Sequence, residues 1–543
     1  MFRTLGPDGS PVDGFRFDGN TVSWTGAEPV RAGIRYELEL DGPPDWLVPG
    51  VFYGENRPAA CTRIYPRFAP HVDLERMESP AWSFRADRCA TPAVFCGGRG
   101  LVTTELSPLG QAGVGFALRD GRPVVWLDFP YREEPLRYDG SETAAPPDVQ
   151  THRWEPGESV TLDIREADRS VLHPSEPFVD PGRVSVEEAA GLAAWGLFRW
   201  HFLPDPPRLV ETRSFDGTQV RDHMHVSWVS GAPYAYALLR HGERVGNDEY
   251  VAAANAVLDE IDRNLTPGGT YWPQWTHDRG WTWGWHPDHD RAHARTLADA
   301  ALFMLRAGRR GSARSNLEVA VRSQREDGAL AAAYSISTGD AVSWEGTAGM
   351  AWIPPLVEAG ELEAARRGGA YFRELDHWYG APEDVDLAPT HEDGIAAVMA
   401  AVALEDWEWA GRAAEWMLTF RYTYDVDFDP DTDLGRHGFR TRGADQASPA
   451  NQHLHAFALF CLPELLRLAE ATGDDRHRQG AHENLACFRQ FIARYDGDFG
   501  ARKGMAAERY LQTDCFGPKG TLDPLSHAWS IGVLLLACEE HLA

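Results

Sequence analysis

Two kinds of hydrophobic pattern divide the chain. Over about the first 170 residues, apolar and polar side chains alternate in short runs that are separated by Gly, Pro and turn dipeptides, which is typical of β-strands. Asp120-Gly121 lies between two such runs and predicts a hairpin turn. Many short strands at this spacing predict an all-β sandwich over residues 1–170. The clearest runs are residues 21–24, 34–40, 113–118, 124–129 and 160–164.

From residue 185 onward, apolar positions recur every three to four residues, which predicts helices. Ser185 and Glu188 form a capping box at the first of them, and residues 171–184, with three Pro, are predicted to be a linker. No strand pattern is visible between the helices. About twelve helices are predicted, at 186–202, 226–241, 247–264, 291–307, 314–324, 345–358, 361–375, 392–404, 406–421, 451–472, 475–494 and 526–541.

The links between these helices are alternately short and long. Helices joined in this way predict six α-hairpins that close into an (α/α)6 toroid over residues 185–543. An open α-solenoid is the alternative, but the chain has no fixed-period repeat and its loops are very unequal. The long segments are expected to gather at one mouth of the ring. They cover residues 265–290, 325–344, 421–450 and 495–525.

Composition narrows the classes of function. A net charge of −29 disfavours nucleic acid and anionic membrane surfaces as partners, since both require clustered Lys and Arg. Seven scattered Cys without a C-x-x-C pair favour buried, reduced thiols. No phosphate loop or dinucleotide fingerprint is present, so no cofactor is expected. The N-terminus carries no secretory signal, and the longest apolar run, 531–537, is too short to span a bilayer, so a cytoplasmic location is expected.

The most unusual stretch is 271–285, which holds five Trp within fourteen residues. Sugars stack their C–H faces on indole rings, and the indole N–H can bond a hydroxyl. Trp275, Trp283 and Trp285 are therefore predicted to bind substrate. The alternative is that these rings only fill the interface between the two domains.

Two histidines follow directly. His289 and His293 are four residues apart, which could make a metal-binding face, but no H-E-x-x-H pattern is present and no third ligand is evident. We therefore predict no metal, and expect His293 and Arg295 to point toward a substrate.

Candidate catalytic carboxylates occur in two places. Glu392 lies in the first turn of a helix, where the helix dipole favours an ionised base or nucleophile, although an ordinary acidic first turn would look the same. Asp393 fits a capping box with Thr390, and Asp445 lies in the polar segment before the 451–472 helix. Glycoside hydrolysis requires two carboxyl groups flanking the bond, which predicts Glu392 with Asp445 as the pair. Asp393, Glu345 and Asp290 are held in reserve.

Polar groups beside these acids are predicted to bind sugar hydroxyls: Asn451, His453 and His455, with Asn451 alternatively serving only as a helix cap. Arginines are also frequent here, which suggests an anionic sugar such as a uronic acid, or else simple pairing with nearby Asp. They are Arg291, Arg295, Arg421, Arg436, Arg440 and Arg442, of which Arg442 is counted among the predicted binding residues.

The aromatic loop, Thr-His-Glu-Asp-Gly at 390–394 and Asn-Gln-His-Leu-His at 451–455 resemble the six-hairpin glycosidase superfamily, over roughly residues 185–543. A β-glucuronidase-like family is the nearest likeness within it. The resemblance implies an accessory N-terminal sandwich that contributes loops to the cleft, with residues 53–58 and 63–67 as candidates.

The leading hypothesis is a glycoside hydrolase that removes a terminal uronic acid from an oligosaccharide. One alternative is a polysaccharide lyase that uses His293, His453 or Tyr422 as the base. The other is a sugar-binding scaffold without catalytic activity.

Overall fold

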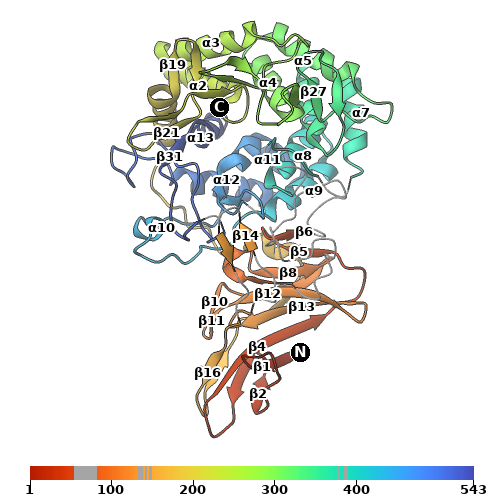
Figure 1. Ribbon diagram of the computed structural model, residues 1–543, viewed down its shortest axis with the longest axis vertical. Helices are drawn as coiled ribbons and strands as arrows, with labels where there is room; N and C mark the ends of the chain where they lie inside the picture. The colour runs from red at the N-terminus through yellow and green to blue at the C-terminus, as the bar shows by residue number, and fades with distance from the viewer. Residues whose placement is uncertain are drawn as a thin grey trace.

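The computed structural model of the chain separates into a β part and a helical part (Figure 1). It describes residues 1–53, 82–132, 138–140, 143–145, 149–375, 378–383, 389–449, 451–515 and 517–543. Of the two loops that were expected to reach the cleft, residues 54–58 and 63–67 lie outside the described residues.

Two antiparallel sheets build most of the β part. The first has the order β1 (Phe2–Leu5), β4 (Val30–Glu39), β13 (Arg122–Phe129), β12 (Gly113–Arg119), β7 (Trp82–Arg85). The second has the order β18 (Arg165–Ala167), β9 (Arg99–Val102), β8 (Ala93–Cys96), β5 (Trp46–Val48), β6 (Phe52–Tyr53). Strand β13 contacts β8 and β9, and apolar side chains of both sheets share one core.

The hairpin turn expected at Asp120-Gly121 is confirmed. Arg119 pairs with Arg122 across it, and φ is +49° at Asp120 and +78° at Gly121. Two positive φ values in succession are the signature of the turn that matches strand twist, and glycine accepts that conformation without strain.

The described residues contain thirteen α-helices. Their bounds are α1 Val186–Gly196, α2 Ala232–Val245, α3 Asp248–Arg263, α4 Ala294–Arg306, α5 Arg310–Arg322, α6 Ile353–Ala359, α7 Leu362–Phe372, α8 His391–Ala403, α9 Trp407–Leu418, α10 Asp433–Arg436, α11 Leu462–Thr472, α12 Asp475–Arg489 and α13 Ala528–Leu542. The 3-10 helices η5 (Ala348–Trp352) and η6 (Ala456–Cys461) lead into α6 and α11.

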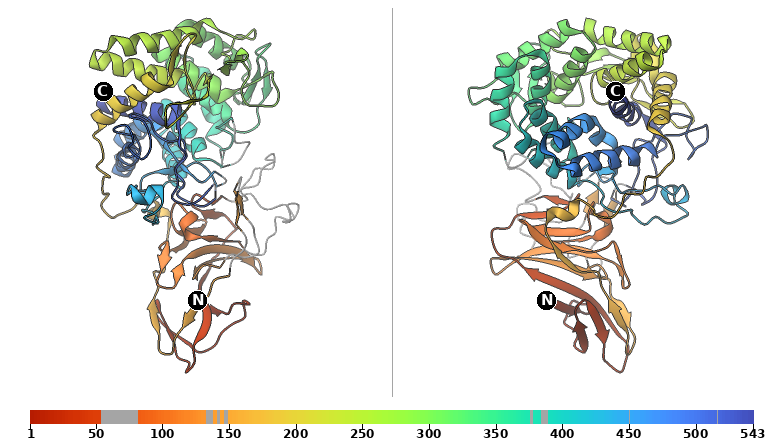
Figure 2. Two further views of the ribbon diagram at one scale, coloured as in Figure 1. Left: turned by 60° about the vertical axis from the view of Figure 1, so that its left-hand side comes forward. Right: turned by 180° about the vertical axis from the view of Figure 1, so that it is seen from behind.

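Contacts among these helices close a ring (Figure 2). Neighbours in sequence pair as α2 with α3, α4 with α5, α6 with α7, α8 with α9 and α11 with α12, while α1 pairs with α13. One helix of each pair contacts the next pair, in the order α13, α2, α4, α6, α8, α11 and back to α13. The expectation of a sheet-rich part followed by paired helices is therefore confirmed. A single large apolar core runs between the helices.

Some details of the predicted elements are wrong. Short strands, β19 to β31, do lie between the helices, but each has only two or three residues, too few for a period of two to be visible in sequence. The helix expected from 451 begins at Ala456, because β30 (Leu454–His455) pairs with β29 (Asp445–Gln446) instead.

The described helices include none with both the length and the apolar composition needed to cross a membrane. The six described cysteines are all buried and unpaired, as expected for reduced thiols.

Candidate active site

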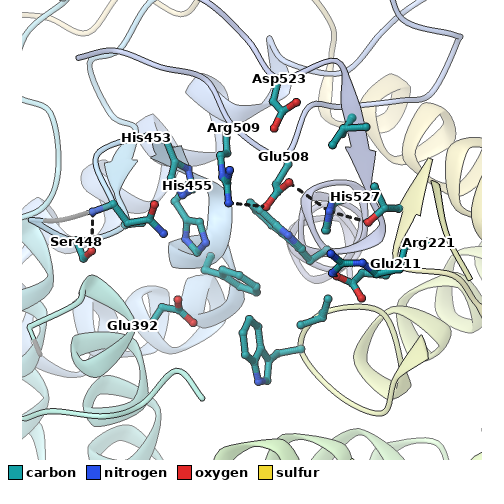
Figure 3. A pocket seen from close by; sticks show the side chains of 18 of the residues that line it. Glu211, Arg221, Glu392, Ser448, His453, His455, Glu508, Arg509, Asp523 and His527 are labelled. Atoms are coloured by element: carbon teal, nitrogen blue, oxygen red, sulfur yellow. Dashed lines mark hydrogen bonds and ion pairs between the residues drawn. The ribbon is translucent and has the colours of Figure 1, made fainter. Parts of the chain in front are cut away.

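A cavity of about 420 Å³ lies at the end of the ring where the inner helices begin (Figure 3). Its lining comes from the segments just ahead of α2, α4, α8, η6 and α13, so three of the four long segments meet at this cavity, while 325–344 contributes none of its lining. Strand β31 (Leu525–His527) pairs with β21 (Thr212–Ser214), which adds the segment after α1 to the wall. Rigid helices thus present loop side chains drawn from all along the chain.

One wall carries Glu392, in the first turn of α8 and 6% exposed. Arg295 of α4 donates from Nη1 to Glu392 and, at 3.1 Å, from Nε to Asp299. A guanidinium that donates to a buried carboxyl stabilises its ionised form. Burial raises the pKa of Asp299 to about 6, assisted by the charge of Glu392 and opposed by Arg295. Glu392 thus reaches the cavity from a buried cluster that it forms with Arg295 and Asp299.

The other wall carries a second pair of carboxyl groups, Glu508 and Asp523 (Figure 3). Glu508 lies 3.3 Å from Nε2 of His527 and 3.4 Å from Arg509. Burial raises the pKa of Glu508 in spite of nearby Arg509 and Arg221. The pKa of Asp523 is raised by burial and then by the charge of Glu508. Two acids this close do not ionise together easily, so this wall retains a proton to higher pH.

Three histidines on the lining are neutral. Burial lowers the pKa of His453 to about 3 and that of His455 well below its ordinary value. Burial, together with the charges of Arg221 and Arg509, also lowers the pKa of His527 to about 3. The Nε2 atom of His527 lies 2.8 Å from Oγ1 of Thr212. A neutral imidazole can donate one hydrogen bond and accept another, which suits hydroxyl-rich ligands.

Several polar atoms of the lining side chains are buried without a partner. Within the described part of the chain, Trp228 Nε1, Asn451 Oδ1 and His527 Nδ1 form no hydrogen bond. Buried polar groups are nearly always paired in native structures, because an unpaired one costs about 1–3 kcal/mol. Three side chains of one cavity therefore keep polar atoms that pair with no described group, and these atoms are themselves buried.

No family model and no curated protein sequence matches the chain. Solved structures do match. One is a D-mannose isomerase, with a TM-score of 0.46, 15% identity and coverage of 68% of this chain and 99% of the other. A polysaccharide lyase has a TM-score of 0.49, 10% identity and coverage of 98% and 91%. The GH76 α-mannanase of Bacteroides thetaiotaomicron has a TM-score of 0.42, 12% identity and coverage of 68% and 97%.

In the present chain, the closed ring follows from its own helix contacts.

The cavity brings together part of the predicted site. Glu392, Trp285, Asn451, His453 and His455 all line it. Trp285 also stacks on His225 with ring centroids 5.0 Å apart. Arg295 lies one contact behind the lining and reaches it through Glu392.

The predicted partner of Glu392 is elsewhere. Asp445 is 0% exposed and accepts hydrogen bonds from Arg421 Nε at 3.0 Å and Asn484 Nδ2 at 2.6 Å. It does not line the cavity, so the prediction that Glu392 and Asp445 flank one bond is corrected. The reason is a buried ion pair that uses both of its oxygens.

Asp393 is occupied as a cap. Its carboxyl accepts hydrogen bonds from the backbone N–H groups of Ala381 at 2.8 Å and Thr390 at 2.9 Å, in the capping box expected from sequence. Burial raises the pKa of Asp393 to about 7, while these hydrogen bonds act against the rise. It holds the start of α8 and thereby orients Glu392.

Four other predicted binding residues lie outside the cavity. Arg208 covers the Trp275 ring at 4.3 Å, and Trp283 stacks on His289 at 4.0 Å. His293 precedes α4 and contacts the carbonyl oxygen of Gly380 at 3.2 Å through Nε2. Arg442 donates to the backbone carbonyl of Glu176 at 2.7 Å. Each of these side chains is held by local packing, so its type alone was no guide to its position.

Sequence reasoning missed most of the lining. Trp228 was assigned to a helix, although α2 begins only at Ala232. The segment 495–525 was marked as a long connection, but nothing in its pattern singled out its acids. The missed residues include Glu211, Arg221, Trp228, Glu508, Arg509, Asp523, His527 and Trp529. Among the described residues, no cluster of three or more His, Cys, Asp or Glu suits a metal ion.

Proposed function

We propose that this chain is a carbohydrate-active enzyme that hydrolyses a glycosidic bond. The unpaired polar atoms of Trp228, Asn451 and His527 carry the proposal, because hydroxyl groups on a sugar would satisfy all of them. Aromatic rings of Trp228, Trp285 and Trp529 supply faces for the C–H side of a pyranose.

The two carboxyl-bearing walls have complementary roles in this proposal. Asp523, whose pKa is raised and whose side chain has no ion pair among the described residues, donates its proton to the glycosidic oxygen as the C–O bond breaks. Glu392 takes a proton from the water that attacks the anomeric carbon. The water oxygen stays on the sugar, and proton transfer through solvent restores both groups. Glu392 with Asp523 thus replaces Glu392 with Asp445.

Two guanidinium groups favour a terminal uronic acid as the substrate unit, even though the lining carries more carboxyl than guanidinium groups and Arg221 is paired with Glu211 at 2.7 Å. Arg221 and Arg509 line the wall that carries Asp523, and guanidinium groups match the geometry of carboxylates. A cavity of about 420 Å³ is at the small end of ligand sites, which favours one or two sugar units over a long chain. The proposed partner is therefore a short anionic oligosaccharide.

The test is a screen against chromogenic glycosides and glycosiduronic acids, with the anomers of the product followed by NMR. Glu392→Gln and Asp523→Asn should each remove turnover of the substrate found, while Glu345→Gln, an exposed acid from a neighbouring loop, should not. Full turnover in Glu392→Gln and Asp523→Asn would overturn the assignment. Binding without any product would instead favour the sugar-binding scaffold.

A polysaccharide lyase is a second candidate, favoured by the neutral imidazole of His527 beside Arg221 and Arg509. The arginines would neutralise a uronate carboxylate while the imidazole removes the C5 proton and the glycosidic oxygen leaves. Of the bases proposed from the sequence, His453 lines the cavity. Tyr422 does not line it, and its hydroxyl donates to Gln446 Oε1 at a distance of 3.0 Å. New ultraviolet absorbance from an unsaturated uronate would identify the lyase.

For the organisation of the chain, we propose an accessory β-sandwich over residues 1–170, a linker over 171–184 and a catalytic (α/α)6 barrel over 185–543. The two-sheet core of the β part and the ring of helix contacts support these limits. The proposed chemistry uses side chains only and requires no cofactor.

A further inference from the structure

A hairpin-like loop connects the cavity to the β part. Tyr510 bridges Leu522, and Leu511 donates its backbone N–H to the Thr521 carbonyl at 2.9 Å. Glu508 and Arg509 come just before this loop and Asp523 just after it. The base of the loop 510–522 therefore carries the acids of one cavity wall, and any shift of the loop moves them.

The tip of the same loop is held by ion pairs from the β part. Lys519 Nζ lies 2.8 Å from Glu105 and 3.2 Å from Asp87, whose side chains are 7% and 2% exposed. Asp514 accepts from Arg85 Nη1 at 2.6 Å. These contacts join residues more than 400 positions apart in sequence, as the separations of 414 and 429 show.

The β-part residues that hold the tip are themselves fixed to the helical part. Thr423 donates its backbone N–H to the Ala90 carbonyl at 3.0 Å, and the Tyr424 hydroxyl donates to the Cys89 carbonyl at 3.2 Å. Gln446 donates from Nε2 to the Gly50 carbonyl, one residue before the cavity-lining Ala447. The β part is thus hydrogen-bonded to the helical part at these three points, one of them beside the cavity-lining Ala447.

We infer that the β part is a clamp that positions the acids of the cavity through the loop 510–522, with Lys519 and Asp514 as positioning residues. The inference rests on the proposed function only for its catalytic consequence, since the mechanical coupling is independent of the reaction. Loss of the clamp would let the base of the loop move and admit water to Glu508 and Asp523. The accessory part would then act on catalysis without touching substrate.

The test uses the full chain with Lys519→Met, and with Lys503→Met as the matched control. Lys503 belongs to the same segment, but it is exposed and approaches only the Trp195 ring, at 5.6 Å. In Lys519→Met we expect faster hydrogen–deuterium exchange over residues 505–525 and kcat about 10- to 100-fold lower. The alkaline limb of the pH profile should move to lower pH, because a hydrated Asp523 loses its proton more easily. Lys503→Met should match the wild type in hydrogen–deuterium exchange, in kcat and in the pH profile.

Asp514→Asn removes the ion pair between Asp514 and Arg85, which is the second contact at the tip of the loop. This variant tests the clamp if Lys519→Met does not fold. Exchange over 505–525 that equals the wild type in the folded variant would overturn the clamp. Faster exchange with an unchanged pH profile would also overturn it, because the loop would then be held for stability alone. If the wild type turns over no glycan, the proposed function fails, while the exchange measurement still tests the coupling.

Discussion

At the scale of single residues, Arg295 is the most consequential side chain behind the cavity. It is 3% exposed, donates to Glu392 and Asp299, and lies over the Trp228 ring at 4.8 Å. When Glu392 and Asp299 are both ionised, the cluster that these two acids form with Arg295 carries one net negative charge. That cluster faces the wall that carries Asp523, whose pKa is raised by burial and by the charge of Glu508.

The first prediction concerns Glu392. Glu392→Gln keeps the size of the side chain but removes the base, so kcat should fall by about 10²- to 10⁴-fold. Chromogenic assays measure the loss, and circular dichroism should show an unchanged fold. Glu345→Gln serves as the control, and equal losses in both variants would contradict the role of Glu392.

The second prediction concerns pH. Glu508→Gln removes the negative charge that helps raise the pKa of Asp523, so Asp523 should ionise at lower pH. Because the protonated form of Asp523 is the acid, activity should be lost at a lower pH than in the wild type. The measurement is the alkaline limb of kcat against pH, and a limb that stays in place would argue against Asp523 as the acid.

At the scale of elements, Asp445 joins pieces of the helical ring. Its bonds to Arg421, just after α9, and to Asn484 of α12 tie β29 to two outer helices. A buried ion pair contributes little net stability when intact, but breaking it leaves an unpaired charge.

The third prediction follows from that tie. Asp445→Asn should lower the free energy of unfolding by about 3–5 kcal/mol, because the Arg421 guanidinium loses its anion in a buried place. Urea denaturation measures the change. The folded variant, assayed at low temperature, should retain the kcat of the wild type. A variant of full stability without activity would restore Asp445 as a catalytic candidate.

Most helices were predictable because they are long enough to show their period, as in α3, where Asn247 caps the first turn and Val257, Leu258 and Ile261 are buried. The four-residue α10 is too short for this and was not predicted. The start of α2 was misplaced, since the turn before it is as apolar as the helix. Glu392 was found because it follows a recognisable cap. Glu508 and Asp523 were not, because a three-residue strand pair, β21 with β31, brings their segment to the cavity.

At the scale of the whole molecule, charge is the dominant feature. The net charge of −29 includes both buried pairs, such as Arg35 with Asp128, and many exposed acids. Repulsion among exposed acids destabilises the compact state and is screened by salt, whereas buried pairs are screened much less.

The fourth prediction is therefore that the unfolding temperature rises between about 0.01 M and about 0.5 M NaCl, as the Debye length falls well below 30 Å. Differential scanning fluorimetry measures the change, and KCl should give the same curve as NaCl. An unfolding temperature that falls with salt would show that exposed ion pairs outweigh the repulsion.

The way the ring closes has a consequence for biosynthesis. Helix α13 contacts both α1 and α2, and His527 at its start belongs to the cavity. It leaves the ribosome after every other helix described, so the nascent chain must keep the apolar inner faces of α1 and α2 uncovered until translation has passed residue 542. Closure of the barrel therefore waits for α13, and a chain that stops within this helix would have an open seam and an incomplete pocket.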